Sequence, residues 1–222
     1  MNKIVKDALI LFAITLVAGI LLGGVYEITK NPIAEQNEKA KQKAYKEVLT
    51  EADTFEAISG DAYSESNITA TFADLLKSDS ENYEADEITD VVAGIKDGKV
   101  VGLVVTVVAG DGYGGDIKFS IGVSSEGKYM GTSILSIGET AGLGMRVKTD
   151  PSFLSQFKDA VTDKFILVKD GSGAAAGDEK IDAISGSTVT SKAVLRGINA
   201  ALLAYKSVYE ANVITVGGVT VE

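Results

Sequence analysis

The hydrophobic and polar positions separate the chain into an apolar N-terminal run and a longer region in which the two kinds alternate. Residues Ala8 to Val25 carry no charge. Eighteen helical residues span roughly 27 Å at about 1.5 Å each, which is close to the hydrocarbon core of a bilayer. Tyr26 follows the run, where an aromatic ring favours the membrane interface. The pattern predicts one transmembrane helix over residues 8–26, surrounded by membrane lipid.

The charges before the apolar run predict its orientation. Lys3 and Lys6 precede it, and Asp7 is the one negative charge on that side. Positively charged flanks of a membrane helix stay in the cytoplasm. We therefore expect residues 1–7 inside the cell and the soluble region outside it. A cleaved signal peptide and a buried core helix are the alternatives. The run is long for a signal peptide and no A-x-A site follows it, which favours an uncleaved, single-pass anchor in the cell membrane.

A stalk and a connecting segment are predicted over residues 27–85. Asn31-Pro32 breaks the helical pattern, and residues 33–49 then form a charged helix rich in strong helix formers. A polar stretch with a short helix near residues 72–76 follows.

Residues 86–222 predict a soluble α+β domain built on an antiparallel meander. β-branched residues flank Asp97-Gly98, a dipeptide typical of hairpin turns. Alternation over residues 116–124 and a second hairpin over 124–137 bring the meander to about four strands. The sequence has no internal repeat and no dinucleotide-binding glycine fingerprint.

The C-terminal part of this domain combines short elements with one long helix. We expect a short helix over residues 151–161, a strand over 164–168, a loop over 170–179 and an edge strand within 214–222. The strongest amphipathic pattern covers residues 191–211. Its apolar face, which we expect in the core, consists of Val194, Ile198, Leu202, Tyr205 and Val208.

The composition limits the chemistry that the chain performs alone. It has no cysteine, histidine or tryptophan, which excludes disulfides, thiolate-held zinc or iron–sulfur sites, His-ligated haem and a His-based triad. The formal net charge of −10 argues against nucleic acid as a partner, because phosphate binding needs a basic face. No motif for independent catalysis is present. A redox role would therefore require an organic cofactor.

The segment from Asp182 to Lys192 carries the candidate chemistry, because small hydroxyl residues lead directly into the long helix. The first turn of a helix offers unpaired N–H groups and the positive end of the helix dipole, which together bind anions. Gly186 permits close approach of a ligand to the backbone, and Lys192 adds a positive charge. The alternative is a simple helix cap, for which serine and threonine are favoured.

The same segment resembles the flavinylation motif D-x-x-[ST]-G-A-T of a family of FMN-binding membrane subunits. The resemblance implies that FMN is joined through its phosphate to Thr188, with Thr190 as the competing hydroxyl. Ser187 stands where alanine is usual and adds a hydroxyl beside the acceptor. The cofactor-binding residues expected in this segment, from the motif and from the anion site together, are Asp182, Ser185, Gly186, Ser187, Thr188, Val189, Thr190 and Lys192.

Two further segments agree with that family. Residues 139–144 (ETAGLG) resemble its E-T-P-G-L-G segment, with Ala141 in place of proline, and residues 112–115 (GYGG) resemble its G-Y-x-G turn. The first of these lies against the flavin in the family; the alternative is an ordinary helix start or turn. The two segments add six residues to the expected site: Tyr113, Glu139, Thr140, Gly142, Leu143 and Gly144.

Together with the single membrane helix, the motifs make the chain similar to the G subunits of Rnf ferredoxin:NAD oxidoreductase complexes. The C subunits of sodium-translocating NADH:quinone reductases are related but usually longer. The resemblance implies an electron-transfer subunit of a translocase, carrying FMN as a phosphoester (and so a phosphoprotein), in a complex that couples electron transfer to Na⁺ or H⁺ movement. It also implies the A, B, C, D and E subunits of the Rnf complex as partners, and a separate flavin transferase that makes the bond. The alternatives are a free-standing extracytoplasmic flavin carrier and a structural subunit without flavin.

Overall fold

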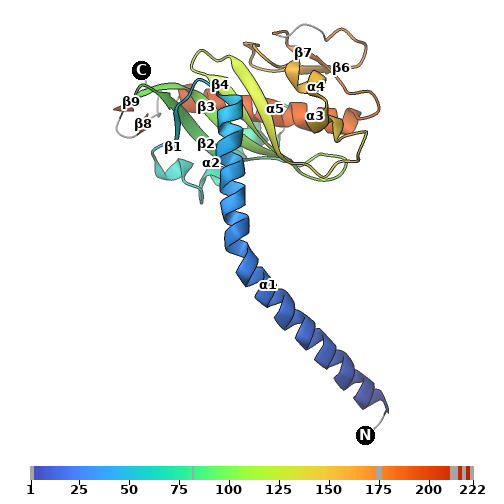
Figure 1. The fold of residues 1–222 in the computed structure, drawn as a ribbon. Helices are drawn as coiled ribbons and strands as arrows, with labels where there is room; N and C mark the ends of the chain where they lie inside the picture. The colour runs from blue at the N-terminus through green and yellow to red at the C-terminus, as the bar shows by residue number, and fades with distance from the viewer. Residues whose placement is uncertain (1–2, 82, 174–176, 211–214, 217–218, 221–222) are drawn as a thin grey trace. The chain divides into compact units, whose positions relative to one another are not determined.

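The structure divides into two compact units, residues 1–41 and residues 42–222. It is a computed structural model (Figure 1), and it describes residues 3–81, 83–173, 177–210, 215–216 and 219–220. The second unit contains every β-strand that the structure describes. It therefore includes the connecting segment expected before residue 86 as well as the β-rich region after it.

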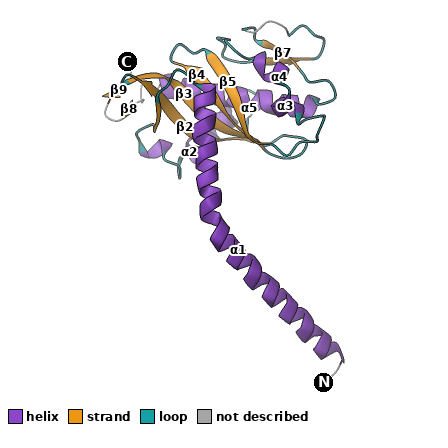
Figure 2. Ribbon diagram, viewed as in Figure 1, coloured by secondary structure: helices purple, strands orange, loops and turns teal. Residues whose placement is uncertain are grey.

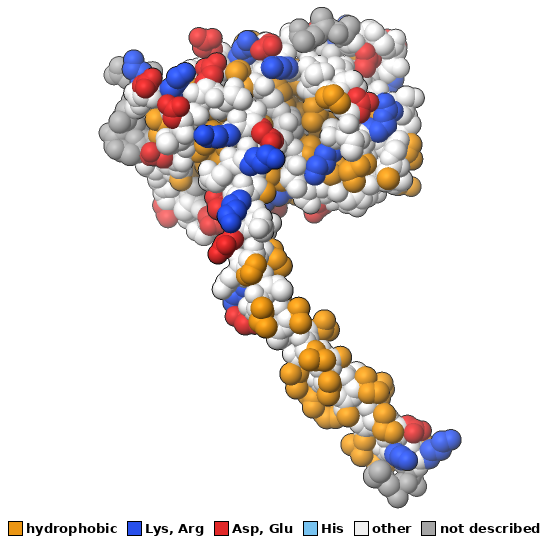
Figure 3. All heavy atoms as spheres, viewed as in Figure 1, with side chains coloured by type: hydrophobic (Ala, Val, Ile, Leu, Met, Phe, Trp, Pro, Cys, Tyr) orange, Lys and Arg blue, Asp and Glu red, His pale blue; other side chains and the backbone are white. Residues whose placement is uncertain are grey.

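Helix α1 runs without interruption from Lys3 to Val48 (Figure 2). The expected break at Asn31-Pro32 is wrong, because Pro32 lies inside the helix. A proline removes its own amide from the hydrogen-bond ladder and its ring crowds the carbonyl four residues earlier, but the strong helix formers that follow continue the helix. The most apolar 18-residue window of α1 is wholly exposed (Figure 3). By length and composition this helix is able to cross a membrane.

Five antiparallel strands form one sheet in chain order, β1-β2-β3-β4-β5. Their bounds are Thr54–Ala57, Asp86–Lys96, Lys99–Ala109, Ile117–Ser124 and Tyr129–Ser136. The hairpin expected at Asp97-Gly98 is confirmed, and both residues have the positive φ (50° and 75°) that a two-residue turn requires. The sequence pattern misses β1, a four-residue strand at the edge of the sheet.

One face of the sheet packs against α2 (Ile68–Ser78) and α5 (Thr188–Glu210). The apolar face predicted for α5 is buried throughout: Val194, Ile198, Leu202, Tyr205 and Val208. Gly197 permits a close approach, since a Cβ there would lie 2.8 Å from the ring of Phe119. The α+β fold class is confirmed, and α5 begins three residues before the predicted start at 191.

The opposite face of the sheet is covered by the last turns of α1, where Tyr45 and Val48 are buried. A row of polar residues that are successive cross-strand partners lies on this face: Asp90, Thr106, Ser120 and Ser133. Thr106 and Ser120 bond each other at 2.8 Å, and the two ends of the row bond Tyr45 and Glu47. Side-chain hydrogen bonds thus fix the end of α1 to the sheet at one register.

Short elements complete the domain. They are η1 (Asp61–Tyr63), α3 (Arg146–Thr149), α4 (Pro151–Ser155), β6 (Ile166–Val168), β7 (Lys180–Asp182), β8 (Thr215–Val216) and β9 (Val219–Thr220). The helix expected over 151–161 ends at Ser155, and the unexpected strand β7 pairs in parallel with β6. The sequence predicts that the tail adds an edge strand, but its described strands β8 and β9 pair with each other and not with the five-stranded sheet. Residues 174–176 of the expected loop and residues 214, 217–218 and 221–222 of the expected edge strand lie outside the described residues.

Candidate cofactor-binding site

Three segments that are far apart in the sequence line one cleft of about 570 Å³. They are the turn after β3, the loop after β5 and the first turn of α5. The lining residues are Tyr113, Glu139, Thr140, Leu143, Gly144 and residues 186–190. The structure therefore brings together all of the predicted site residues except Gly142, Asp182, Ser185 and Lys192.

The meander explains why the first two segments meet. β3 and β5 run in the same direction, because β4 lies antiparallel between them. The turn that follows β3 and the loop that follows β5 therefore leave the sheet at the same edge. The helix α5 is held close to this edge, since a Cβ on Gly197 would lie 3.0 Å from that of Ala109, the last residue of β3.

Glu139 joins the two loops. Only 5% of this residue is exposed, and its carboxylate accepts the N–H of Gly114 at 3.1 Å. Gly144 lies against the same side chain: a Cβ on it would come within 2.9 Å of the Glu139 Cβ and 2.6 Å of the Thr190 hydroxyl oxygen. The absence of a side chain at Gly144 therefore lets the loop pack against the start of α5.

Two glycines with positive φ shape the turns around the cleft. Gly142 (φ 77°) lies in the turn where Leu143 and Met145 donate to the carbonyl of Thr140. It does not line the cleft, but its turn presents Leu143 at the rim. Gly186 (φ 79°) does line the cleft, and a Cβ on it would lie 3.6 Å from the Leu143 side chain.

Each of the three segments contributes one exposed apolar side chain to the cleft, namely Tyr113, Leu143 and Val189. Among the described residues of the second unit, only Val161 and Ile166 are other large apolar side chains with comparable exposure. Exposed apolar groups gathered at one place mark a binding surface. The cleft therefore offers apolar contacts for a planar aromatic ligand beside a polar helix end.

The first turn of α5 has unused hydrogen-bonding groups. The Ser187 residue is only 6% exposed, and its hydroxyl has no hydrogen-bond partner among the described residues. The backbone amides of residues 188–190 also have no hydrogen-bond partner among the described residues. The turn is held instead by Ser191, whose hydroxyl donates to the Ser187 carbonyl and accepts the N–H of Ile184. An anionic ligand in this cleft would find free donors and the positive end of the helix dipole.

These observations fit the FMN expected from the motifs. The walls of the cleft suit an isoalloxazine ring, the helix end suits a phosphate, and the buried Ser187 hydroxyl lacks a partner that a ligand oxygen can supply.

The hydroxyl groups near the helix start differ in accessibility. Thr188 is half-buried and lines the cleft, whereas Thr190 is 2% exposed and Ser187 is nearly as buried. Ser185 is exposed but lines a different cleft together with Asp182. Thr188 is thus the one candidate hydroxyl that both lines the flavin-sized cleft and is reachable.

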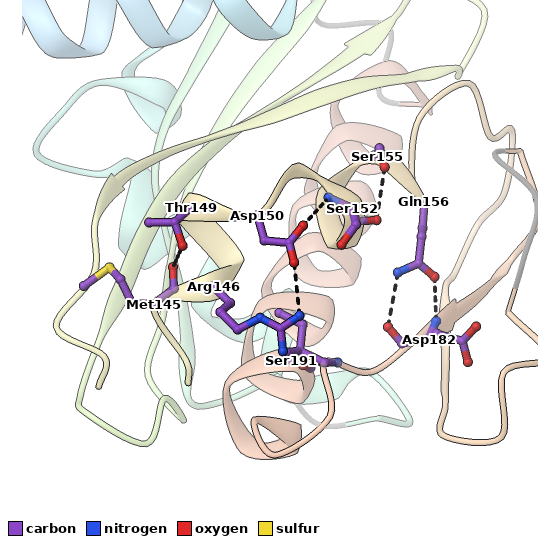
Figure 4. A network of polar contacts seen from close by, with 10 residues as sticks. Met145, Arg146, Thr149, Asp150, Ser152, Ser155, Gln156, Asp182 and Ser191 are labelled. Atoms are coloured by element: carbon purple, nitrogen blue, oxygen red, sulfur yellow. Dashed lines mark hydrogen bonds and ion pairs between the residues drawn. The ribbon is translucent and has the colours of Figure 1, made fainter. Parts of the chain in front are cut away.

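Asp182 lies on β7, away from the cleft lining. Its backbone exchanges two hydrogen bonds with the Gln156 side chain, at 2.8 and 3.2 Å (Figure 4). Its carboxylate accepts the N–H of Gly171. Asp182 therefore anchors the strand that leads into residues 183–187.

Lys192 lines a second cleft of about 540 Å³, which Thr188 also borders. Three further basic residues line it: Lys164, Lys169 and Arg196. Lys169 and Lys192 have no ion-pair partner in the described part of the chain. Sequence reasoning missed Lys169 and Arg196, because nothing in the local pattern brings residue 169 to the helix start.

Arg196 connects α5 to the turn after β3. It pairs with Asp111, beside that turn, and lies 3.6 Å from the carboxylate of Asp86 at the start of β2. Burial raises the pKa of Asp86 to about 6, although the guanidinium of Arg196 opposes the shift. The 112–115 turn is thereby fixed to the helix through Asp111, the residue that precedes it.

Comparisons with known proteins agree with the motifs. Residues 112–203 match the family model described as an FMN-binding domain, and residues 1–48 match the RnfG N-terminal region. The chain is similar to the G subunit of the Na(+)-translocating ferredoxin:NAD(+) oxidoreductase complex of Acetobacterium woodii, at 32% identity over 91% of both chains. It is 30% identical to the G subunit of the proton-translocating ferredoxin:NAD(+) oxidoreductase complex of Clostridium ljungdahlii, over 89% of this chain and 92% of that one. The G subunit of an ion-translocating oxidoreductase complex of Shewanella amazonensis is 27% identical over 91% and 88%.

Proposed function

Because the chain belongs to the family of G subunits of ion-translocating ferredoxin:NAD⁺ oxidoreductase complexes, we propose that it carries FMN covalently on Thr188 and passes electrons between redox centres of such a complex. It is a membrane-associated electron-transfer subunit. Its partners are other subunits of the complex. FMN supplies the electron-transfer chemistry, while the chain holds and positions it.

The accessibility of Thr188 is the observation that carries the choice of acceptor. A hydroxyl that becomes part of a phosphoester must be accessible to the molecule that supplies the FMN phosphoryl group. Thr188 is more exposed than Thr190 or Ser187. It also begins α5, so a phosphate on its oxygen would lie near free helix amides. Lys192, one helical turn further on, supplies a nearby positive charge.

The flavin ring would occupy the cleft beside Thr188. Tyr113, Leu143 and Val189 would contact its apolar faces, and the buried Glu139 would hold the two loops in place around it. This role is supported by the position of these four residues, which line the same cleft as Thr188 although they come from three separate segments.

A separate flavin transferase would make the bond. A threonine hydroxyl is a weak nucleophile without a base, and the chain contains no histidine to act as one. Asp182 would then act before attachment, because it anchors the strand that leads into residues 183–187 and so presents this segment to the transferase.

The flavin domain would lie outside the cytoplasm, as the charges before the apolar run of α1 predict. The chain has no native cysteine, so single introduced cysteines report the topology directly. In intact cells an impermeant maleimide should label Glu65→Cys, an exposed site in the second unit, and leave Lys3→Cys unlabelled. The reverse pattern would contradict the orientation.

The names of the relatives assign ion movement but differ in the ion. Na⁺ is named for the relative at 32% identity and the proton for the relative at 30%. Because the two identities are nearly equal, the names of the relatives support ion translocation by the complex of this chain. They do not select Na⁺ or H⁺ as the ion.

The acceptor is tested by co-expression with an active flavin transferase. Wild type should show flavin fluorescence on a denaturing gel, and mass spectrometry should find FMN minus water on a peptide that contains Thr188. Thr188→Val should abolish the signal, whereas Thr190→Val should retain it. A mass on Thr190 or Ser187 would contradict the acceptor, and wild type without added mass would contradict covalent attachment.

A further inference from the structure

We propose that the Ser187 hydroxyl donates a hydrogen bond to the phosphate of the FMN carried on Thr188, an inference that rests on the proposed function. The residue is 6% exposed, and its Oγ has no partner among the described residues. Buried polar groups of folded proteins are nearly always paired, because an unpaired one destabilises the fold. Because Ser187 also lines the cofactor cleft, a group of the ligand is the partner assigned to it.

The Ser187 hydroxyl is not used as a helix cap. The residue directly precedes α5, and a capping hydroxyl at that place accepts the amide of the second or third helical residue. Those amides, of Val189 and Thr190, have no partner within the described ranges. Ser191 stabilises the turn instead, with bonds of 2.9 Å to the Ser187 carbonyl and 3.0 Å from the Ile184 amide. The fold therefore does not need the Ser187 hydroxyl.

The chemistry of the neighbouring residue identifies the ligand group. Consecutive Cα atoms lie about 3.8 Å apart, so the first ligand atoms near Ser187 are those joined to the Thr188 oxygen. In a phosphoester the atom joined to that oxygen is the phosphorus, which carries the phosphoryl oxygens, whereas the flavin ring lies at the far end of the ribityl chain. A hydroxyl that donates to an anionic oxygen makes a bond about twice as strong as a neutral one. Ser187 would thus hold the phosphate against the helix end.

The family motif has alanine where this chain has Ser187, so the hydroxyl is a feature of this chain beyond the general site. The Ser187→Ala change is correspondingly mild, and flavin attachment should survive it. Ser125→Ala is the matched control, because Ser125 is exposed, lies outside the flavinylation motif and does not line the flavin cleft.

The test compares the melting temperatures of full-length variants in detergent, with and without attached flavin. Without flavin, Ser187→Ala should raise the melting temperature, because it removes an unpaired buried hydroxyl. With flavin it should lower the melting temperature, because it removes a hydrogen bond. Shifts of roughly 2–4 °C are expected for a single bond in a chain of this size. The ³¹P resonance of the attached phosphate should also move in Ser187→Ala and stay in place in Ser125→Ala.

Two results would overturn the proposal. A lower melting temperature in both forms would assign Ser187 a structural role. An unchanged ³¹P resonance and melting temperature in the flavinylated variant would show that the hydroxyl does not touch the phosphate. A wild type without flavin, despite an active transferase, is a different outcome: it would refute the proposed function, and this inference would fall with it.

Discussion

Helix α5 and the residue that precedes it carry polar groups of two kinds. In its middle, the Asn199 amide uses both of its functions: it donates to the Phe165 carbonyl at 3.0 Å and accepts the Phe165 N–H at 2.8 Å. At its first turn, the Ser187 hydroxyl and the amides of residues 188–190 have no protein partner in the described ranges. Buried polar groups are normally paired. The buried amide in the middle of the helix is therefore satisfied by the protein itself. The unpaired groups at the first turn are available to a ligand.

This difference implies that stability and cofactor binding separate along one helix. Substitutions in the middle should lower the free energy of unfolding and leave the flavin of the folded protein unchanged. Substitutions around the first turn should change the flavin more than the stability.

The largest stability effect is expected for Asn199→Leu. This change leaves the N–H and C=O of the fully buried Phe165 without partners. Unpaired buried groups cost about 1–3 kcal/mol each, so the free energy of unfolding should fall by roughly 3 kcal/mol. Urea denaturation of the flavin-free protein measures it. Ser207→Ala, which removes only a hydroxyl bond to the Ala204 carbonyl on the same helix, is the control.

Flavin attachment per folded molecule should stay at the wild-type level in Asn199→Leu. If the folded variant lost its flavin, or if its stability fell by less than about 1 kcal/mol, the division between the two parts of α5 would be wrong.

The sequence predicts those parts of the fold that local patterns determine. The period of apolar positions gave the buried face of α5, and Asp97-Gly98 gave the central hairpin. It missed β1 and β7, which have four and three residues and exist because distant strands pair with them. It also placed a break at Pro32, where the flanking helix formers prevail.

The candidate site shows the same limit. Motif order supplied its three segments, and the antiparallel meander brings them to one edge. The roles of Asn199, Arg196 and Lys169 depend on tertiary contacts, so no local pattern indicates them. Asp182 belongs to the motif, and its role toward the cofactor stays a prediction; in the structure its hydrogen bonds anchor β7.

Asp86 is intermediate between the two kinds of polar group, because it is buried but has a charged partner in Arg196. Its pKa in the folded protein is about 6, above the ordinary 3.8. The folded state therefore holds this proton more tightly than the unfolded state. The resulting stabilisation is complete below the ordinary pKa and is lost as the pH rises through about 6. Through this group the wild type should lose roughly 2 kcal/mol between pH 4 and pH 7.

Asp86→Asn tests this pH dependence, because the variant has no proton to lose at that position while Arg196 keeps Asp111 as a partner. The free energy of unfolding should fall less steeply with pH in the variant than in the wild type across that interval. Identical slopes would show that burial does not perturb the Asp86 carboxyl. Flavin attachment should be unaffected, since Asp86 does not line the cleft.

The smallest stability effects are expected at two glycines of the same loop, and these sharpen the comparison most. Gly142→Ala places a Cβ at a φ of 77°, with no atom within 4 Å of it. Gly144→Ala instead places a Cβ 2.6 Å from the Thr190 hydroxyl oxygen and against Glu139. Backbone strain in the first case and crowding in the second should each lower the free energy of unfolding by about 1–2 kcal/mol. Only Gly144→Ala displaces residues that line the cleft, so it alone should shift the flavin absorption bands and reduction potential. Equal spectral shifts in both variants would mean that the loop moves as a unit, and that the position of a residue at the cleft does not decide its effect on the flavin.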